Sequence, residues 1–158
     1  MSMLYLGING DLHLTRHFKL SELVDTSVNP PQFHLNERSL CFVQAIQSFR
    51  DWYARPINVN SWFRTAKHNL EVGGSSNSSH LVARAVDFDL PTDYFTFDKF
   101  RKEKFIANIK VEWTLICKSY GFMPQFNIYK SYIHLGFSLS DKSSFRDYRK
   151  GDGSWIPF

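Results

Sequence analysis

Hydrophobic and polar residues recur along this chain with two different periods, and these periods predict where helices and strands lie. Bulky residues at helical spacing predict one helix from Asn36, a good capping residue, to about Ala54. Its buried face consists of Phe42, Ile46, Phe49 and Tyr53. A longer helix is predicted from Asp98 to Tyr120, ended by Gly121. The residues that it turns inward are Phe105, Ile109, Trp113 and Ile116.

Shorter segments have the composition and spacing of strands. Ile57–Asn60 and Ala85–Leu90 each predict one strand, and two further segments predict a hairpin turned by Lys130-Ser131. The strands of this hairpin are Phe126–Tyr129 and Tyr132–Phe137. Alternation over Leu4–Leu14 around Asn9-Gly10 predicts an N-terminal hairpin.

Two short helical segments complete the pattern. Leu20–Asp25 predicts a helical turn, and Thr65–Val72 predicts a short helix stopped by Gly73-Gly74. Because helices and strands are mixed without strict alternation, we expect an α+β fold with a small antiparallel sheet and helices packed on one side. We expect one domain over residues 1–158, with 1–16 as an N-terminal hairpin addition and 139–158 as a C-terminal tail.

Composition narrows the class of protein. The 158 residues are 43% hydrophobic and 22% charged, as in an ordinary globular protein, which we expect to be a monomer. The net charge of +4 is compatible with a polyanionic target, but no nucleic-acid-binding motif is present, so we expect no nucleic-acid partner. Met1–Leu14 resembles neither a signal peptide nor a membrane span, which predicts cytoplasmic accumulation and no membrane insertion.

Three residues offer the strongest candidate chemistry. His80 and Asp87 lie in one segment, and His134 lies far downstream in an apolar run. Two histidines and one aspartate leave a tetrahedral zinc ion one position for water, as in catalytic zinc sites. Residue types alone keep the alternative of surface histidines and a solvated carboxylate open, since this pattern is looser than paired CxxC motifs.

The segment from Ser78 to Asp87 resembles the SxHxxGxAxD signature of the zinc D-alanyl-D-alanine carboxypeptidase family. That family also contains phage L-alanyl-D-glutamate endopeptidases, VanX-type dipeptidases and the Hedgehog signalling domain. The matching residues are Ser78, His80, Ala85 and Asp87. Ala83 stands where the signature has glycine. The question at this position is whether the fold has room for the methyl group of alanine.

Four other segments resemble the family in the same order along the chain. Asn60–Thr65 is similar to an SGYRS stretch with Trp62 in place of glycine, and Asn69–Gly74 is similar to an NxxVGG stretch. His17–Leu23 resembles the FTLSEL opening of the bacterial and phage-borne branch, and Tyr129–His134 resembles the closing strand. The resemblance therefore covers roughly residues 17–138, and it implies a Hedgehog/DD-peptidase-like fold.

The resemblance implies a role for each matching residue. His80, Asp87 and His134 would bind Zn²⁺, and Arg64 would hold a substrate carboxylate or polarise its carbonyl group. Ser78 and Gln125 would support a ligand or contact the substrate. For Arg64 the alternative is a surface salt bridge, and for Ser78 and Gln125 it is an ordinary loop residue.

One part of the family pattern is missing. The positions that usually hold the catalytic acid or base carry Ser131, Tyr132 and Gly136, and no carboxylate lies between Glu112 and Asp141. Tyr132 is a poor base because its ordinary pKa is about 10, although it can donate a hydrogen bond to the substrate. We therefore expect weak activity.

The resemblance implies a zinc-dependent peptidoglycan peptidase that acts on the stem peptide. It would be either a carboxypeptidase at D-Ala-D-Ala or an endopeptidase, and a phage or prophage lysis protein. The alternative hypothesis is a zinc-binding domain with impaired catalysis that binds wall peptide or a protein partner.

Overall fold

A mixed β-sheet forms the centre of the molecule in a computed structural model, which describes residues 5–6, 12–151 and 153–156. Its six strands lie in the order β3-β4-β6-β5-β7-β8. Their bounds are β3 Val59–Ser61, β4 Ala85–Asp89, β5 Pro124–Ile128, β6 Tyr132–Phe137, β7 Ser144–Asp147 and β8 Ser154–Trp155. All neighbouring pairs are antiparallel except β5 and β7, which are parallel.

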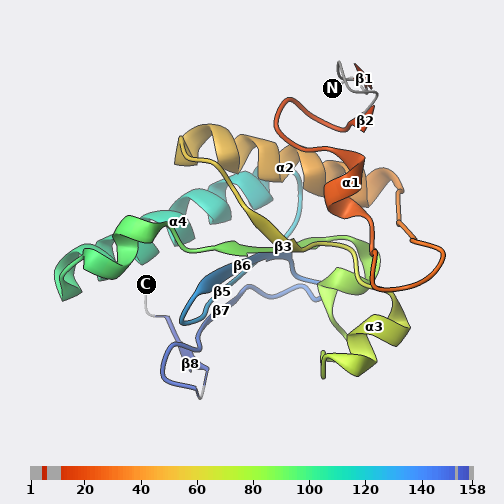
Figure 1. The fold of residues 1–158 in the computed structure, drawn as a ribbon. Coiled ribbons are helices and arrows are strands. Elements are labelled where there is room, and N and C mark those ends of the chain that lie inside the picture. The colour runs from red at the N-terminus through yellow and green to blue at the C-terminus, as the bar shows by residue number, and fades with distance from the viewer. Residues whose placement is uncertain (1–4, 7–11, 152, 157–158) are drawn as a thin grey trace.

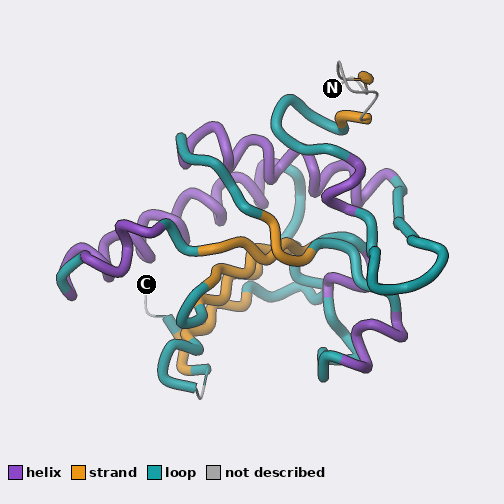
Figure 2. Tube along the Cα trace, viewed as in Figure 1, coloured by secondary structure: helices purple, strands orange, loops and turns teal. Residues whose placement is uncertain are grey.

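Two long helices cover one face of this sheet (Figure 1). They are α2, Glu37–Tyr53, and α4, Lys99–Ser119, and Figure 2 shows them together on the same side of the strands. Asn36 caps α2 by accepting a hydrogen bond from Ser39 N, and Asp98 caps α4 by accepting one from Arg101 N. The shorter elements are α1 Leu20–Leu23, α3 Ala66–Glu71, and the 3₁₀ helices η1 Ser79–Val82 and η2 Thr92–Thr96.

The hydrophobic core lies between these two helices and the sheet. In a strand, alternate side chains point to opposite faces, so every second residue of β4, β5 and β6 enters the core. These residues are Val86, Phe88, Phe126, Ile128, Ile133, Leu135 and Phe137. Trp113 of α4 and Phe42 of α2 pack against them, and both are fully buried. The other face of the same strands carries polar side chains and stays free of the long helices.

The α+β class and the placement of helices on one side are confirmed. The expectation of an antiparallel sheet is corrected by the parallel pairing of β7 with β5. The sequence also predicted a tail over residues 139–158, yet β7 and β8 of this segment extend the sheet. Both strands are short and join through backbone hydrogen bonds, so their side chains carry too little alternation to reveal them.

The N-terminal hairpin is seen in part. β1, Tyr5–Leu6, pairs antiparallel with β2, Leu12–His13, in a separate two-stranded sheet. The turn predicted at Asn9-Gly10 lies outside the described residues. Among the described residues, Cys41 and Cys117 form no disulfide.

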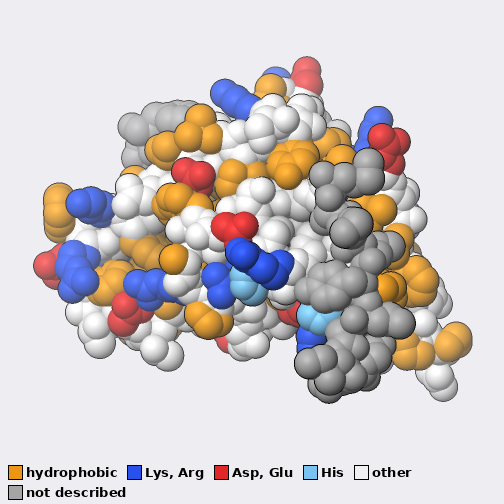
Figure 3. All heavy atoms as spheres, turned by 90° about the horizontal axis from the view of Figure 1, so that it is seen from above, with side chains coloured by type: hydrophobic (Ala, Val, Ile, Leu, Met, Phe, Trp, Pro, Cys, Tyr) orange, Lys and Arg blue, Asp and Glu red, His pale blue; other side chains and the backbone are white. Residues whose placement is uncertain are grey.

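One face of the molecule shows a mixed surface. On the face seen in Figure 3, basic side chains are interspersed with acidic and hydrophobic ones. None of the helices in the described part of the chain has both the length and the apolar character needed to cross a membrane.

Candidate metal centre and active-site cleft

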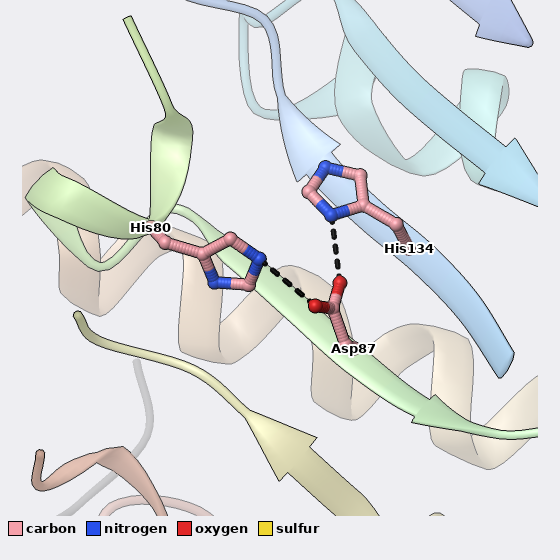
Figure 4. A group of neighbouring side chains, drawn as sticks. All are labelled: His80, Asp87 and His134. Atoms are coloured by element: carbon pink, nitrogen blue, oxygen red, sulfur yellow. Dashed lines mark hydrogen bonds and ion pairs between the residues drawn. The ribbon is translucent and has the colours of Figure 1, made fainter. Parts of the chain in front are cut away.

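Three side chains from separate elements converge on the helix-free face of the sheet. His80 comes from η1, while Asp87 of β4 and His134 of β6 lie directly opposite each other in the strand register. His80 Nε2 lies 3.2 Å from Asp87 Oδ2, and His134 Nδ1 lies 2.7 Å from Asp87 Oδ1. All three residues are buried, and Figure 4 shows both rings turned toward the carboxylate. The structure thus brings together the three residues that the sequence singled out.

Hydrogen bonds on the outer side of each ring fix its tautomer. His80 Nδ1 lies 2.6 Å from the Trp62 carbonyl oxygen, and His134 Nε2 lies 2.9 Å from Gln125 Oε1. A carbonyl oxygen can only accept, so with the Gln125 amide in this orientation both of these ring nitrogens carry the hydrogen. In the neutral rings, His80 Nε2 and His134 Nδ1 are therefore left with lone pairs that face Asp87.

This arrangement requires a cation. Lone pairs of two rings and the oxygens of a carboxylate repel one another unless a proton or a metal ion lies among them. Burial lowers the pKa of His80 and so favours its neutral form, even though the Asp87 carboxylate acts in the opposite direction. Burial opposes ionisation of Asp87, but wherever a proton lies between the carboxylate and the two rings, the interaction with His134 and His80 outweighs burial and lowers the pKa of Asp87. Asp87 is thus ionised at neutral pH.

The donor atoms also have suitable spacing for a metal ion. One ligand atom from each of the three residues lies within 4.8 Å of the others. Zinc–ligand bonds of about 2.0–2.2 Å place tetrahedral ligands roughly 3.4 Å apart, close to the distance from His80 Nε2 to Asp87 Oδ2. Two imidazole nitrogens and a carboxylate are a ligand set that suits zinc. The residues present therefore fit the ion that the sequence predicted.

Arg64 lies in the same cleft as this centre. One terminal nitrogen donates to Asn69 Oδ1 at 3.1 Å, and the other donates to Ser61 Oγ at 3.2 Å and lies 3.8 Å from Asp87 Oδ2. Its Nε is buried without a hydrogen-bond partner. The alternative of a surface salt bridge is wrong, since the Arg64 side chain is largely buried and its carboxylate partner is Asp87 of the metal centre.

Gly74 has a steric reason to be glycine. A Cβ atom at this position would lie 2.1 Å from Asn69 Oδ1 and 3.1 Å from an Arg64 nitrogen. The NxxVGG segment therefore provides the Asn69 side-chain amide that holds Arg64, and its Gly74 leaves space for both of these side chains. The sequence contained this signal, but it did not indicate that Asn69 orients Arg64.

Ser78 and Gln125 occupy different positions relative to the centre. Ser78 Oγ accepts a hydrogen bond from His80 N at 3.3 Å, so this serine caps η1 and lines the cleft. Gln125 Oε1 hydrogen-bonds His134, which is one of the candidate metal ligands. The neighbouring Ser79, which the sequence did not single out, donates to the Phe137 carbonyl oxygen at 3.0 Å and lies 3.2 Å from Gln125 Oε1.

Gly136 makes room for Gln125. It lies opposite Gln125 in the register of β5 and β6, and a Cβ atom there would lie 2.8 Å from Gln125 Oε1. One of the positions where the family usually has an acidic residue is thus occupied from the neighbouring strand.

Three tyrosines form one wall of the cleft. Tyr129 stacks between Tyr132 and Tyr148, with ring centroids 4.3 Å and 4.8 Å apart. Burial raises the pKa of Tyr132, so its phenol stays protonated at neutral pH and can act as a hydrogen-bond donor. Tyr148 follows β7 and was not predicted from the sequence, because the C-terminal segment was expected to be a tail.

The cleft that these residues line has a volume of about 650 Å³. Among its described lining residues, Asp87 is the single carboxylate. Asp87 is held between the two histidines, so it is not available as a general base. Within the described part of the chain, no lining side chain is thus a carboxylate free to act as a general base.

The backbone at Ala83 explains the glycine of the family signature. Ala83 has φ of 55°, in the left-handed region that glycine adopts most readily. Its methyl group is buried in the hydrophobic core, so it fits. The sequence raised only the question of space, whereas the position also carries a conformational requirement.

Comparison with known protein families identifies one that matches this chain. The model of the peptidase M15 family matches residues 16–113, which is more than half of the chain. The match includes Arg64, His80 and Asp87, while His134 lies beyond its end and joins the site through β6. No curated protein matches the chain. The match confirms the resemblance to the zinc D-alanyl-D-alanine carboxypeptidases, and the chain belongs to the peptidase M15 family, a family of zinc-dependent peptidases.

Proposed function

We propose that this protein hydrolyses a peptide bond in the stem peptide of peptidoglycan with the help of a zinc ion. The observation that carries the proposal is the convergence of His80, Asp87 and His134, with both ring nitrogens facing Asp87 held as lone pairs. Family membership supports the same class of chemistry.

His80, Asp87 and His134 would hold the zinc ion. When bound, zinc supplies a Lewis acid that lowers the pKa of water and polarises a carbonyl oxygen. The protein's contribution is to fix the ligands. The Trp62 carbonyl orients His80, and Gln125 orients His134. Hydrogen bonds of this kind hold each ring in the orientation that binding of the ion requires.

The charge balance of the cleft favours an anionic substrate. A divalent ion and the Arg64 guanidinium face a single carboxylate among the described lining residues. A terminal nitrogen of Arg64 lies 3.8 Å from Asp87 Oδ2, beside this centre. Stem peptides carry carboxylates close to their amide bonds, so both a carboxypeptidase at D-Ala-D-Ala and a stem-peptide endopeptidase fit. In either case Arg64 would hold the carboxylate on the leaving-group side.

Tyr132 would supply a hydrogen-bond donor to the carbonyl oxygen or to the departing amine. Its ring lines the cleft and its phenol stays protonated. A donor of this kind stabilises developing negative charge but does not remove a proton from water. Loss of general-base help typically costs about 10²- to 10⁴-fold in rate, so we propose slow rather than absent hydrolysis.

The lack of a general base supports a second candidate function. Asp87 is the one carboxylate among the described residues of the cleft, so the second candidate is a zinc-binding domain that recognises wall peptide without cleaving it. The similarity of His17–Leu23 to the phage-borne branch supports a further proposal for the enzyme, namely a role in phage or prophage cell-wall lysis. Under this proposal the protein is a monomer made in the cytoplasm, and its substrate lies in the wall.

A combined metal and cleavage assay separates the two functions. Purified protein is analysed for zinc before and after chelation, and each form is incubated with stem peptides that end in D-Ala-D-Ala and with stem peptides lacking this terminus. Zinc-dependent cleavage establishes the peptidase. Stoichiometric zinc and peptide binding without cleavage establishes the binding domain.

Two variants test the assigned roles. Arg64→Lys keeps the charge but loses the planar fork, so it should raise KM while zinc content stays the same. Tyr132→Phe removes the phenol and should lower kcat by about 10- to 100-fold, the effect of losing one hydrogen-bond donor of about 1–3 kcal/mol. Full activity of both variants would remove these residues from the mechanism.

A further inference from the structure

Asn127 lies in the cleft with an unsatisfied polar atom. It is 9% exposed, and its Oδ1 is buried without a hydrogen-bond partner. The Asn127 side chain also interacts with the Tyr129 hydroxyl by a hydrogen bond that acts to lower the pKa of Tyr129, against the larger opposite effect of burial. Nothing in the sequence marked this residue, since an asparagine within a strand has no motif of its own.

An unpartnered buried acceptor has a cost that calls for an explanation. Leaving such a group unsatisfied typically costs about 1–3 kcal/mol, and native structures contain few examples. Unsatisfied groups of this kind at a binding site are satisfied when a ligand brings the matching donor. The donor that fits a carboxamide oxygen is an N–H or O–H group.

The strand register places Asn127 in the same row as the metal centre. His134 pairs with Asp87 on one side and with Asn127 on the other, and Asn127 also lines the cleft. Arg64 follows β3 and contacts the Asp87 side of this row. Arg64 and Asn127 therefore lie on opposite sides of His134, so a peptide held by both would cross the centre.

We propose that Asn127 is a substrate-binding residue whose Oδ1 accepts a hydrogen bond from a backbone N–H of the bound peptide. The N–H is the one on the acyl side of the scissile bond, because Arg64 holds the carboxylate on the leaving-group side. Because χ2 of asparagine is a broad torsion, the amide can exchange its contact with Tyr129 for one with the peptide and turn its oxygen into the cleft. This proposal rests on the proposed peptidase function and names one of its recognition contacts.

A matched pair of non-cleavable ligands tests the contact. Both are phosphinate analogues of the stem-peptide terminus. One carries an amide N–H on the acyl side of phosphorus, and the other carries CH₂ at that position. Their dissociation constants are measured by calorimetry with the zinc-loaded wild type, Asn127→Leu, Asn127→Ala and the control Asn77→Leu. Asn77 lines the same cleft but its side chain is exposed.

The wild type should bind the N–H ligand about 10- to 100-fold more tightly than the CH₂ ligand. Asn127→Leu and Asn127→Ala should lose this preference, with zinc content unchanged, whereas Asn77→Leu should keep it. Asn127→Leu should unfold at nearly the same temperature as the wild type, because it removes the unsatisfied acceptor together with the hydrogen bond to Tyr129.

Equal affinity of the wild type for both ligands overturns the proposal without any variant. Retention of the preference by both Asn127 variants overturns it too. Failure of the proposed peptidase function gives a different result. In that case the wild type does not cleave stem peptides or binds neither phosphinate. Cleavage by the wild type together with equal binding of the two ligands removes Asn127 alone.

Discussion

The two faces of the central sheet are built from the same strands but obey different rules. On the helix-covered face, Val86 and Phe88 of β4 pack with Ile133 and Leu135 of β6, and all four are fully buried. On the cleft face, the intervening Asp87 and His134 form part of the candidate metal centre. The first face is held by the total apolar area that it removes from water, which tolerates small changes of shape. The second depends on single atoms at fixed distances.

Support for the cleft face comes from groups that the core face also needs. Trp113, in the core, donates its indole hydrogen to the carbonyl oxygens of Gln125 and Gly136 at 3.1 and 3.2 Å. The Trp62 ring packs edge-on against Phe18 and Phe42, while its carbonyl oxygen orients His80. A well-packed core therefore fixes the backbone from which the polar side chains of the cleft project.

The sharpest contrast is between neighbouring residues of β6. His134→Ala removes a ligand and should abolish stoichiometric zinc binding and reduce peptide cleavage to background, with little loss of the metal-free fold. Ile133→Val, one residue away on the core face, should lower the free energy of unfolding by about 0.5–1.5 kcal/mol and leave zinc binding intact. Metal analysis after gel filtration and urea unfolding measure the two effects. Zinc retained by His134→Ala would falsify the ligand assignment.

A smaller effect is expected at the support of His134. Gln125→Leu removes the acceptor for Nε2–H and should weaken zinc affinity by about 10- to 100-fold, measured by competition with a chelator. Gly136→Ala should act in the same direction, because its Cβ would displace Gln125 Oε1. As a control, Phe126→Leu on the core face of β5 should lower stability while zinc affinity is retained. Unchanged affinity in both cleft variants would mean that Gln125 does not orient His134.

The last effect bears on stability and not on zinc, and it concerns Asp25, which ties the N-terminal segment to the turn that carries Arg64. Its Oδ2 accepts from Thr65 N at 2.8 Å, and its Oδ1 accepts from Ser27 Oγ at 2.6 Å and lies 3.1 Å from His68 Nδ1. Burial opposes ionisation, but the hydrogen bonds from Ser27 and Thr65 outweigh it and lower the pKa of Asp25. A lowered folded pKa adds stability that is present above the unfolded pKa of about 3.9 and is lost as the pH falls toward the folded value.

Asp25→Asn should therefore lower the free energy of unfolding at pH 7 by about 1–3 kcal/mol, and the difference from the wild type should shrink below about pH 4. Urea unfolding at several pH values measures this. Asp51→Asn is the matched control, because Asp51 pairs with Arg16 at the surface and should contribute at most about 1 kcal/mol. A difference for Asp25→Asn that is independent of pH would show that its carboxylate charge plays no part.

Much of the fold could be predicted because its signals are local. The face formed by Phe42, Ile46 and Phe49 predicted α2, and the caps Asn36 and Asp98 fixed where the two long helices begin. The hairpin of β5 and β6 followed from alternation around a two-residue turn. β7 and β8 were missed, because the parallel pairing of β7 with β5 depends on a backbone edge far away in sequence.

By itself, the sequence determined which residue types could form the metal centre, since His80 and Asp87 stand in a motif with fixed spacing and His134 stands in a matching strand. Only the tertiary structure decided how they work together. Strand register places Asp87 opposite His134, and contacts from separate segments fix both ring tautomers through Trp62 and Gln125. The same register brings Asn127 and the tyrosine wall to the cleft. Register and tautomer depend on partners distant along the chain, and no local pattern of residues encodes them.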